Sequence, residues 1–491
     1  MTFSNDGVVT IKPMVGRKVL FCSIEEDKLD KDSIIGILKD VLPTHFKNVE
    51  DYNRLNGYYI GYQDILNKRK EIRPDINHIV LENNAYHIVE FSKGFVFGSP
   101  IQYVQTGDSE QIEVDTLNKY MRETFRHTKD MQLGEDWYIG GNAYLMVFPN
   151  DDPYKPFEVY NSSPKETFVV YDTGIGKKKM LGGVIVGKKD YATGKEYLAI
   201  TVYTRSDVYS FRMPSEFDTD KEIEITFIEE EPNWVGRIPI IEYPLNKNRL
   251  GKIEIVKTVL DALNMISSSD IDDIDQFVQA LLVFINAEIN KEEISEMMEM
   301  GAINIVSNSS GRGLEADVKL LSQKLLHSET KILYDRLYNN MLTIVGVPKM
   351  ADKASSGDTG QARLVGEGWT MADEKAKQDE ASFKLADNEL LEIVLDICKN
   401  KQTEIKTLRA SEIDIKFTRN KSDNLLVKTQ GLMNLMSAQV APEVAFEKVG
   451  LFSDSSDAVK QSKAFFGESF WKGESQEEQT LVNNTNNEIV E

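Results

Sequence analysis

Four aspartates close together are the first residues that could do chemistry. They are Asp270, Asp272, Asp273 and Asp275. Paired carboxylates can hold a metal ion or catalyse hydrolysis. A second acidic pair with matching apolar framing is not found elsewhere in the sequence, so we interpret the four as the solvated face of one helix. The alternative is a nuclease, which would need magnesium and would lose cleavage on Asp272→Ala.

The segment from Gly182 to Lys188 nearly spells a phosphate-binding loop. Position 189 is lysine, whereas such a loop needs Ser or Thr there to reach magnesium. The loop must also open a helix whose N-terminal amides hold phosphate, and here the pattern leads into another strand. We therefore predict a hairpin with a Gly-Lys turn.

The other potential nucleophiles and ligands are scattered. No serine lies in a Gly-x-Ser-x-Gly elbow, and the histidines show no pair at metal-ligand spacing (His45, His78, His87, His127 and His327). Cys22 and Cys398 have no visible activating neighbour, which predicts buried thiols in a reducing compartment. We therefore expect neither an enzyme nor a cofactor, and we assign no metal site.

The composition is that of an acidic globular protein. The 491 residues are 41% hydrophobic and 28% charged, with a net charge of -22 and a pI near 4.9. This length allows two to four domains. Proteins that grip DNA usually carry basic patches, so the charge argues against that class. Simple solubility and a surface past which DNA slides both remain open.

Neither export nor a membrane span is expected. Met1 to Leu20 lacks a basic start followed by an apolar core, so we expect no signal peptide. The most apolar stretch, Phe277 to Ile285, is shorter than the ~20 residues that a membrane span needs. We therefore expect a soluble protein made in the cytoplasm, without a membrane partner.

Periodicity predicts a helical start and then a long β region. Residues 1–28 look irregular, and 29–70 read as helices whose apolar stripe (Ile34, Ile35, Leu38, Val41 and Leu42) ends at Pro43. Residues 78–105 alternate short apolar runs with Gly94, Gly98 and Pro100. From Asp136 to Tyr243, short alternating runs separated by turn residues predict an antiparallel meander.

Long helices follow the β region. Lys252 to Ala287 lacks Pro and Gly and predicts one helix of ~54 Å, which needs a partner along its length. Residues 288–318 predict a small mixed module with an acidic helix at 291–300 and a strand at 303–306. A second helix from about Lys319 to Val345 is stopped by Gly346-Val-Pro348.

The remaining chain predicts a loop, a third long helix and a helical end. Residues 349–358 are small, polar and flexible in composition. The third helix starts near Thr359, where Asp358 and Gln361 resemble a capping box. Residues 413–417 alternate like a single returning strand. Residues 422–470 predict two or three helices around Pro442 and Gly450, and the polar tail from Trp471 predicts disorder.

This order of elements resembles the portal, or head–tail connector, family of long-tailed phages that infect Gram-positive bacteria. The resemblance runs from about residue 50 to 465 and rests on the order and spacing of several stretches. They are Tyr58–Gly61, Asn77–Val80, Phe97–Ile101, Tyr138–Tyr144, Phe168–Asp172, Gly236–Glu242, Ile255–Asn264 with Ser269–Ile271, Ser355–Ala362 and Ile415–Asn420.

The resemblance implies an α+β portal fold in a ring of about twelve copies. The implied parts are an N-terminal arm at 1–28, a wing at 29–250 and 359–421, a long-helix stem at 251–287 and 319–347, a small α/β clip at 288–318, a tunnel loop at 348–358, a helical crown at 422–470 and a disordered tail at 471–491. We expect the tunnel loop to meet DNA through Lys349, Lys353, Ser355, Ser356 and Gly357.

The resemblance also implies a function without enzymatic activity. Such a ring sits at one capsid vertex, in the virion after assembly in the host cytoplasm, and double-stranded DNA is packaged, retained and ejected through it. The implied partners are the terminase large subunit, head–tail connector or adaptor proteins, and major capsid and scaffolding proteins. The residues that we expect to dock terminase or connector are Glu292, Glu293, Glu296, Asn308 and Arg312.

Two alternatives remain open, one to the portal function and one to the tunnel loop. The chain could be a capsid or scaffolding protein without a channel, although scaffolding proteins are usually smaller and lack a β region of this length. The segment 349–358 could be an ordinary turn between helices with solvated lysines.

Overall fold

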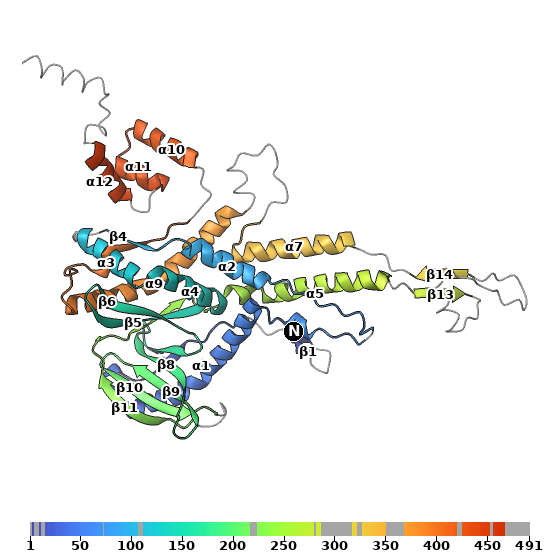
Figure 1. Cartoon of the computed structure of the whole chain (residues 1–491), viewed down its shortest axis with the longest axis horizontal. Coiled ribbons are helices and arrows are strands. Elements are labelled where there is room, and N and C mark those ends of the chain that lie inside the picture. Colours follow the sequence, from blue (N-terminus) through green and yellow to red (C-terminus); the bar gives the residue numbers. More distant parts are fainter. Residues whose placement is uncertain are drawn as a thin grey trace, which may run out of the picture. The chain divides into compact units, whose positions relative to one another are not determined.

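The computed structural model describes residues 2–3, 9–10, 15–71, 73–106, 111–216, 223–278, 281–285, 317–321, 327–349, 368–419, 425–451 and 455–466. The chain divides into two compact units. Unit 1 comprises 1–13, 57–88 and 255–371, and unit 2 comprises 14–56, 89–254 and 372–491. Helices and sheets are both extensive, so the fold is α+β, as predicted (Figure 1).

A six-stranded sheet in unit 2 contains most of the predicted meander. Its order is β11-β10-β9-β8-β7-β3, with each neighbour antiparallel except β3, which pairs in parallel with β7. The meander was therefore predicted correctly for five strands, but residues 1–28 are not all irregular. The strands are β3 (Leu20–Cys22), β7 (Thr167–Asp172), β8 (Lys179–Lys189), β9 (Glu196–Tyr203), β10 (Asp207–Pro214) and β11 (Thr226–Pro232).

The predicted hairpin at Gly182 to Lys188 was placed wrongly. These residues lie inside β8 and pair with both β7 and β9. The chain reverses after Lys189, where the Gly194 N–H donates to the Asp190 carbonyl oxygen at 2.7 Å. A loop that opens a helix is therefore absent at this site, which removes the phosphate-binding alternative.

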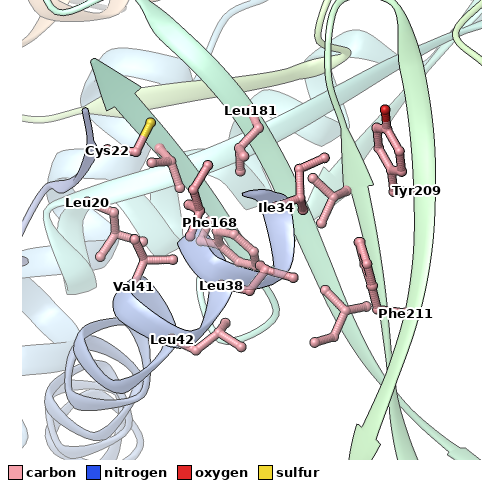
Figure 2. Close-up of a cluster of buried hydrophobic side chains, with 14 of the residues drawn as sticks. Leu20, Cys22, Ile34, Leu38, Val41, Leu42, Phe168, Leu181, Tyr209 and Phe211 are labelled. Carbon is pink, nitrogen blue, oxygen red and sulfur yellow. The ribbon is translucent and has the colours of Figure 1, made fainter. Parts of the chain in front are cut away.

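The helix α1 (Lys31–Ile60) buries its apolar stripe against this sheet (Figure 2). Ile34, Leu38 and Leu42 are fully buried among side chains such as Phe168 and Phe211. The prediction that Pro43 ends the helix is wrong, because Pro43 lies inside α1. Proline in a helix interior costs about 3 kcal/mol, and burial of several large apolar side chains at ~2 kcal/mol each exceeds that cost.

A second, three-stranded sheet in unit 2 has the order β12-β5-β6, with bounds Ile240–Pro244, Asn142–Asp152 and Lys155–Ser162. The β region was predicted to begin at Asp136, but Arg126–Gly140 form the helix α4, so Tyr138 is helical. Gly141 ends α4 with φ 79° and directs the chain into β5. The helices α2 (Asn84–Phe97) and α3 (Gln111–Glu123) precede α4, so half of the residues at 78–105 are helical.

Residues from the C-terminal part complete unit 2. The helix α9 (Trp369–Asn400) buries an apolar face that includes Ala376, Phe383 and Leu390. Gly368 precedes it with φ 85°, so one uninterrupted helix from Thr359 was wrong, whereas 350–367 lie outside the described residues. The returning strand is confirmed as β15 (Ile413–Lys416), paired with β4 (Gln102–Gln105).

The helical end is also confirmed. It contains α10 (Leu425–Ser437), α11 (Pro442–Val449) and α12 (Ser455–Phe466), with Pro442 opening α11 and Gly450 ending it at φ 60°. The shorter elements are β1 (Thr2–Phe3), β2 (Val9–Thr10), η1 (Glu26–Lys28), η2 (Asp64–Asn67) and η3 (Ala410–Glu412).

Unit 1 is built around two long helices joined by a strand pair (Figure 1). The helix α5 (Lys252–Val278) leads to β13 (Leu281–Ile285), which pairs with β14 (Asp317–Leu321) ahead of α7 (His327–Val345). The predicted helices 252–287 and 319–345 were thus each too long. At 1.5 Å per residue α5 spans ~40 Å. The apolar run Leu281-Leu-Val-Phe-Ile285 suits a buried strand as well as a helix, so periodicity alone cannot separate them.

Candidate functional site

The strand pair β13–β14 defines where the expected docking segment leaves and rejoins the fold. Ile285 lies opposite Asp317, and Leu281 lies opposite Leu321. The chain therefore leaves the described residues after Ile285 and re-enters them at Asp317, at two paired positions. The predicted strand at 303–306 and all the expected docking residues lie outside the described residues (Glu292, Glu293, Glu296, Asn308 and Arg312).

The expected tunnel loop is described only at its start. Lys349 is exposed and follows the end of α7. The predicted stop is confirmed, because Gly346 has φ 74° and the Val347 N–H donates to the Leu342 carbonyl oxygen at 2.9 Å. The other expected loop residues lie outside the described residues (Lys353, Ser355, Ser356 and Gly357).

The apolar side chains of α5 are buried only in its first half. Ile253, Val256, Leu260 and Leu263 are at most 1% exposed. In the second half, Met265, Ile271 and Ile274 are 43%, 40% and 43% exposed. α7 likewise exposes Ile332, Leu333 and Ile344, at 68%, 40% and 47%. The second half of α5 and the helix α7 therefore present exposed apolar side chains.

A polar stripe, not an apolar one, holds the second half of α5 within its own unit. It consists of residues three or four positions apart, which share one helix face (Lys257, Asp261, Asn264, Ser268 and Asp272). They contact the segment 61–83, here called the strap, and the end of α1. Sequence reasoning missed this stripe, although its 3–4 spacing is readable as clearly as that of the apolar one.

The inner contacts of the stripe are hydrogen bonds and ion pairs. The Tyr58 hydroxyl donates to Asp261 at 2.7 Å, and Lys257 Nζ lies 2.8 Å from Asp64 Oδ2. Asn264 donates to Gln63 Oε1 at 2.6 Å, and its own Oδ1 accepts the Glu82 N–H at 2.9 Å. Farther out, the Val80 N–H donates to Ser268 Oγ at 2.9 Å.

Asp272 forms the densest contact of the stripe. Its side chain is 1% exposed, and its Oδ2 lies 2.6 Å from Lys68 Nζ and 2.7 Å from Lys70 Nζ. Its Oδ1 accepts the His78 N–H at 2.6 Å and lies 3.0 Å from His78 Nδ1. Burial alone would raise the pKa of Asp272, but these hydrogen bonds hold it well below its usual value.

The interpretation of the aspartates as a solvated face is therefore wrong at Asp272. Asp273 is exposed, whereas Asp270 and Asp275 are half-buried. The segment that covers Asp272 comes from about 200 residues earlier in the chain. A partner at that distance in sequence leaves no local signal.

Unit 2 contains a separate cluster of buried charges. Arg126 Nε lies 2.6 Å from Asp130, and Arg126 Nη2 lies 2.6 Å from Asp387. The hydroxyls of Tyr103 and Tyr243 donate to Asp387 at 2.9 and 2.7 Å. Burial raises the pKa of Asp130 to about 7, although Arg126 opposes the shift. A cavity of about 550 Å³ lies against Tyr103, Arg126 and Asp130.

Other candidate groups gather into no site among the described residues. Within those ranges no three His, Cys, Asp or Glu side chains are close enough to hold a metal ion. Cys22 and Cys398 are buried and free, as predicted. Of the helices described, none is long and apolar enough to cross a membrane.

The chain is similar to known portal proteins. A family model described as "Phage portal protein, SPP1 Gp6-like" matches residues 38–465. The portal protein of Bacillus phage SPP1 is 21% identical over 324 residues. That alignment covers 61% of this chain and spans 61% of the length of the curated relative.

Chains in solved gene transfer agent particles are also similar. One, from the virion of the native particle, is 14% identical with a TM-score of 0.38, covering 75% of this chain and 89% of that one. A chain from the neck of the empty particle, computed with C6 symmetry, is 14% identical with a TM-score of 0.40 and covers 76% and 90%. A third, from the native neck computed with C12 symmetry, is 15% identical with a TM-score of 0.36 and covers 75% and 89%.

Proposed function

Because the chain belongs to the SPP1 Gp6-like family of phage portal proteins, we propose that it forms one subunit of a ring through which double-stranded DNA enters and leaves a capsid. The family match over residues 38–465 is the observation that carries this proposal. The ring sits at one vertex of the virion and is assembled in the host cytoplasm. We propose about twelve copies and no enzymatic activity.

The uncovered apolar side chains of α5 and α7 support a ring. Ile271, Ile274 and Ile332 are 40%, 43% and 68% exposed. Two faces of such a helix pair can meet head to tail around a closed ring, since a heterologous contact repeats until it closes. Each well-covered aliphatic side chain would contribute roughly 1 kcal/mol or more to that contact.

The charge distribution supports passage of DNA without tight binding. The chain carries a net charge of -22, so its surface as a whole repels phosphate. Lys349 is exposed at the end of α7, and Lys353 follows within the glycine- and serine-bearing segment 348–358. We propose that this segment lines the tunnel and makes a few sequence-independent, salt-sensitive contacts with phosphates.

The clip segment 288–318 is the proposed docking site for the packaging motor. It follows β13 and runs into β14, and these two strands pair with each other. We propose that the terminase large subunit, and later head–tail connector proteins, contact Glu292, Glu293, Glu296, Asn308 and Arg312. Major capsid and scaffolding proteins are proposed to contact the ring elsewhere.

Asp272, the central residue of the nuclease alternative, is already engaged by other side chains. Both carboxylate oxygens of Asp272 are occupied by Lys68, Lys70 and His78. A carboxylate that is already neutralised by two ammonium groups is a poor ligand for Mg²⁺. A capsid protein without a channel remains the second candidate, and imaging separates it from a portal.

Electron microscopy of the purified protein tests the proposal. We expect closed rings with a central hole, and solid particles or monomers at all concentrations would overturn it. The double variant Ile271→Ser with Ile274→Ser should shift native mass spectra toward smaller species with unchanged far-UV circular dichroism. Ile175→Ser is the matched control, because Ile175 is fully exposed in a turn and should leave the ring intact.

A further inference from the structure

We propose that the contact of Asp272 with Lys68, Lys70 and His78 is a latch that positions the outer end of α5 for docking of the packaging motor. The inference rests on the proposed function and deepens it. Asp272 is then a positioning residue, which acts through the strands β13 and β14 that flank the proposed clip segment 288–318. It touches neither DNA nor the motor itself.

At this point of α5 a charged side chain is buried and apolar side chains are exposed, which reverses the usual pattern of a helix. Asp272 is buried, whereas its neighbours Ile271 and Ile274 are 40% and 43% exposed. A buried ion pair often stabilises a fold less than apolar residues of the same size would. A buried polar contact instead has a fixed direction and partner, so it sets one register where an apolar contact would tolerate sliding.

The strap folds around the Asp272 carboxylate. Lys68 Nζ also donates to the His78 carbonyl oxygen at 3.0 Å, and Asn77 donates to the Lys68 carbonyl oxygen at 3.1 Å. These two hydrogen bonds join the two ends of the segment 68–78, which follows η2 (Asp64–Asn67). Asp272 contacts both ends of this segment, Lys68 and His78, and its negative charge pairs with Lys68 and Lys70.

Asp272 lies near the outer end of α5. The helix ends at Val278 and β13 begins at Leu281, so Asp272 precedes that end by six residues, or ~9 Å. Among the described contacts between α5 and the strap, those of Asp272 and of Asp275 with His78 lie farthest out. Inner contacts such as that of Lys257 with Asp64 lie 15 residues, or ~22 Å, nearer the start of α5. They therefore constrain the outer end of the helix less than the contacts of Asp272 do.

The test compares two isosteric changes one residue apart. Asp272→Asn removes the charge that Lys68 and Lys70 share, whereas Asp273→Asn removes the same charge from an exposed neighbour. Hydrogen exchange of the assembled full-length protein should quicken about tenfold or more in residues 61–83 for Asp272→Asn only. Phage carrying that change should show at least a several-fold drop in DNA-filled capsids with rings still formed.

Each outcome decides the question. Unchanged exchange in residues 61–83, or equal packaging defects in both variants, would overturn the latch. If Asp272→Asn does not assemble, Lys70→Gln decides, because Lys70 is 32% exposed and its loss leaves Lys68 on the carboxylate. Rings with poor packaging then support positioning, and lost rings show a structural role only. Absence of rings in the unchanged protein would instead remove the proposed function.

Discussion

Asp272 and Asp130 are both buried aspartates, yet their surroundings move their pKa values in opposite directions. Two lysines and His78 offset the burial of Asp272 and lower its pKa. Asp130 shares one arginine with Asp387, so burial prevails and raises its pKa to about 7. Asp272 has two lysines to itself, so its pKa falls, whereas Asp130 and Asp387 share one arginine and the pKa of Asp130 rises. Only tertiary contacts bring these groups together.

Asp130 should make the stability of unit 2 depend on pH. The folded protein keeps the Asp130 proton up to about pH 7, whereas the unfolded chain releases it near pH 3.8. The unfolded state therefore binds fewer protons between these values, and stability falls as pH rises through them. Thermal denaturation should show Asp130→Asn gaining on the unchanged protein from pH 5 to 7, by at most ~1.4 kcal/mol per pH unit. A constant difference across this range would contradict the assignment.

At the scale of elements, the wrong helix predictions have two different causes. The helices at 252–287 and 319–345 were predicted too long because β13 and β14 are apolar runs whose period does not reveal their type. α1 continues through Pro43 because its burial outweighs a local penalty. Elements with a strong period and clear punctuation were predicted correctly, as at Gly346 and Pro442.

Two glycines should respond oppositely to alanine. Gly141 has φ 79°, and a Cβ there would lie 2.3 Å from the Arg249 carbonyl oxygen. We therefore expect Gly141→Ala to cost about 2 kcal/mol or more in the free energy of unfolding. Gly36 lies exposed in α1 with nothing within 4 Å of its Cβ position. Gly36→Ala should gain about 0.5–1 kcal/mol in the same urea titration, and equal effects would refute this account of the α4–β5 junction.

At the scale of the whole molecule, acidity and a few exposed lysines belong together. In the proposed ring, a net charge of -22 per chain would keep phosphate from adhering, and light contact would then depend on a small number of cations in the right place. The second half of α5 and the helix α7 display exposed apolar side chains. A neighbouring copy would cover these side chains in the proposed ring.

Replacing Lys349 and Lys353 by Ala should change DNA packaging or retention while rings still form. The reason is loss of two phosphate contacts per subunit at the proposed tunnel wall. Electron microscopy of rings and the DNA content of purified particles measure the two effects separately. Lys188→Ala with Lys189→Ala removes the same charge from an exposed strand and serves as the control. Lost rings would mean that the loop is structural.

Deleting residues 471–491 should leave ring assembly unchanged. This tail is polar and rich in Glu and Asn, so it offers little apolar area to bury. Native mass spectrometry of the truncated protein provides the measurement, and a shift to smaller species would show that the tail joins subunits.

Local pattern alone predicted the meander, the returning strand, two or three closing helices and the order of elements, whose resemblance to portals implied the α+β fold. These features depend on residues close together in sequence, whose periods and turn residues are readable directly. Tertiary structure alone decided that Asp272 is buried, that β3 joins the sheet and that α5 gives way to β13. Each of these depends on a partner that comes from a distant part of the chain, and a one-dimensional pattern does not contain the distance between them.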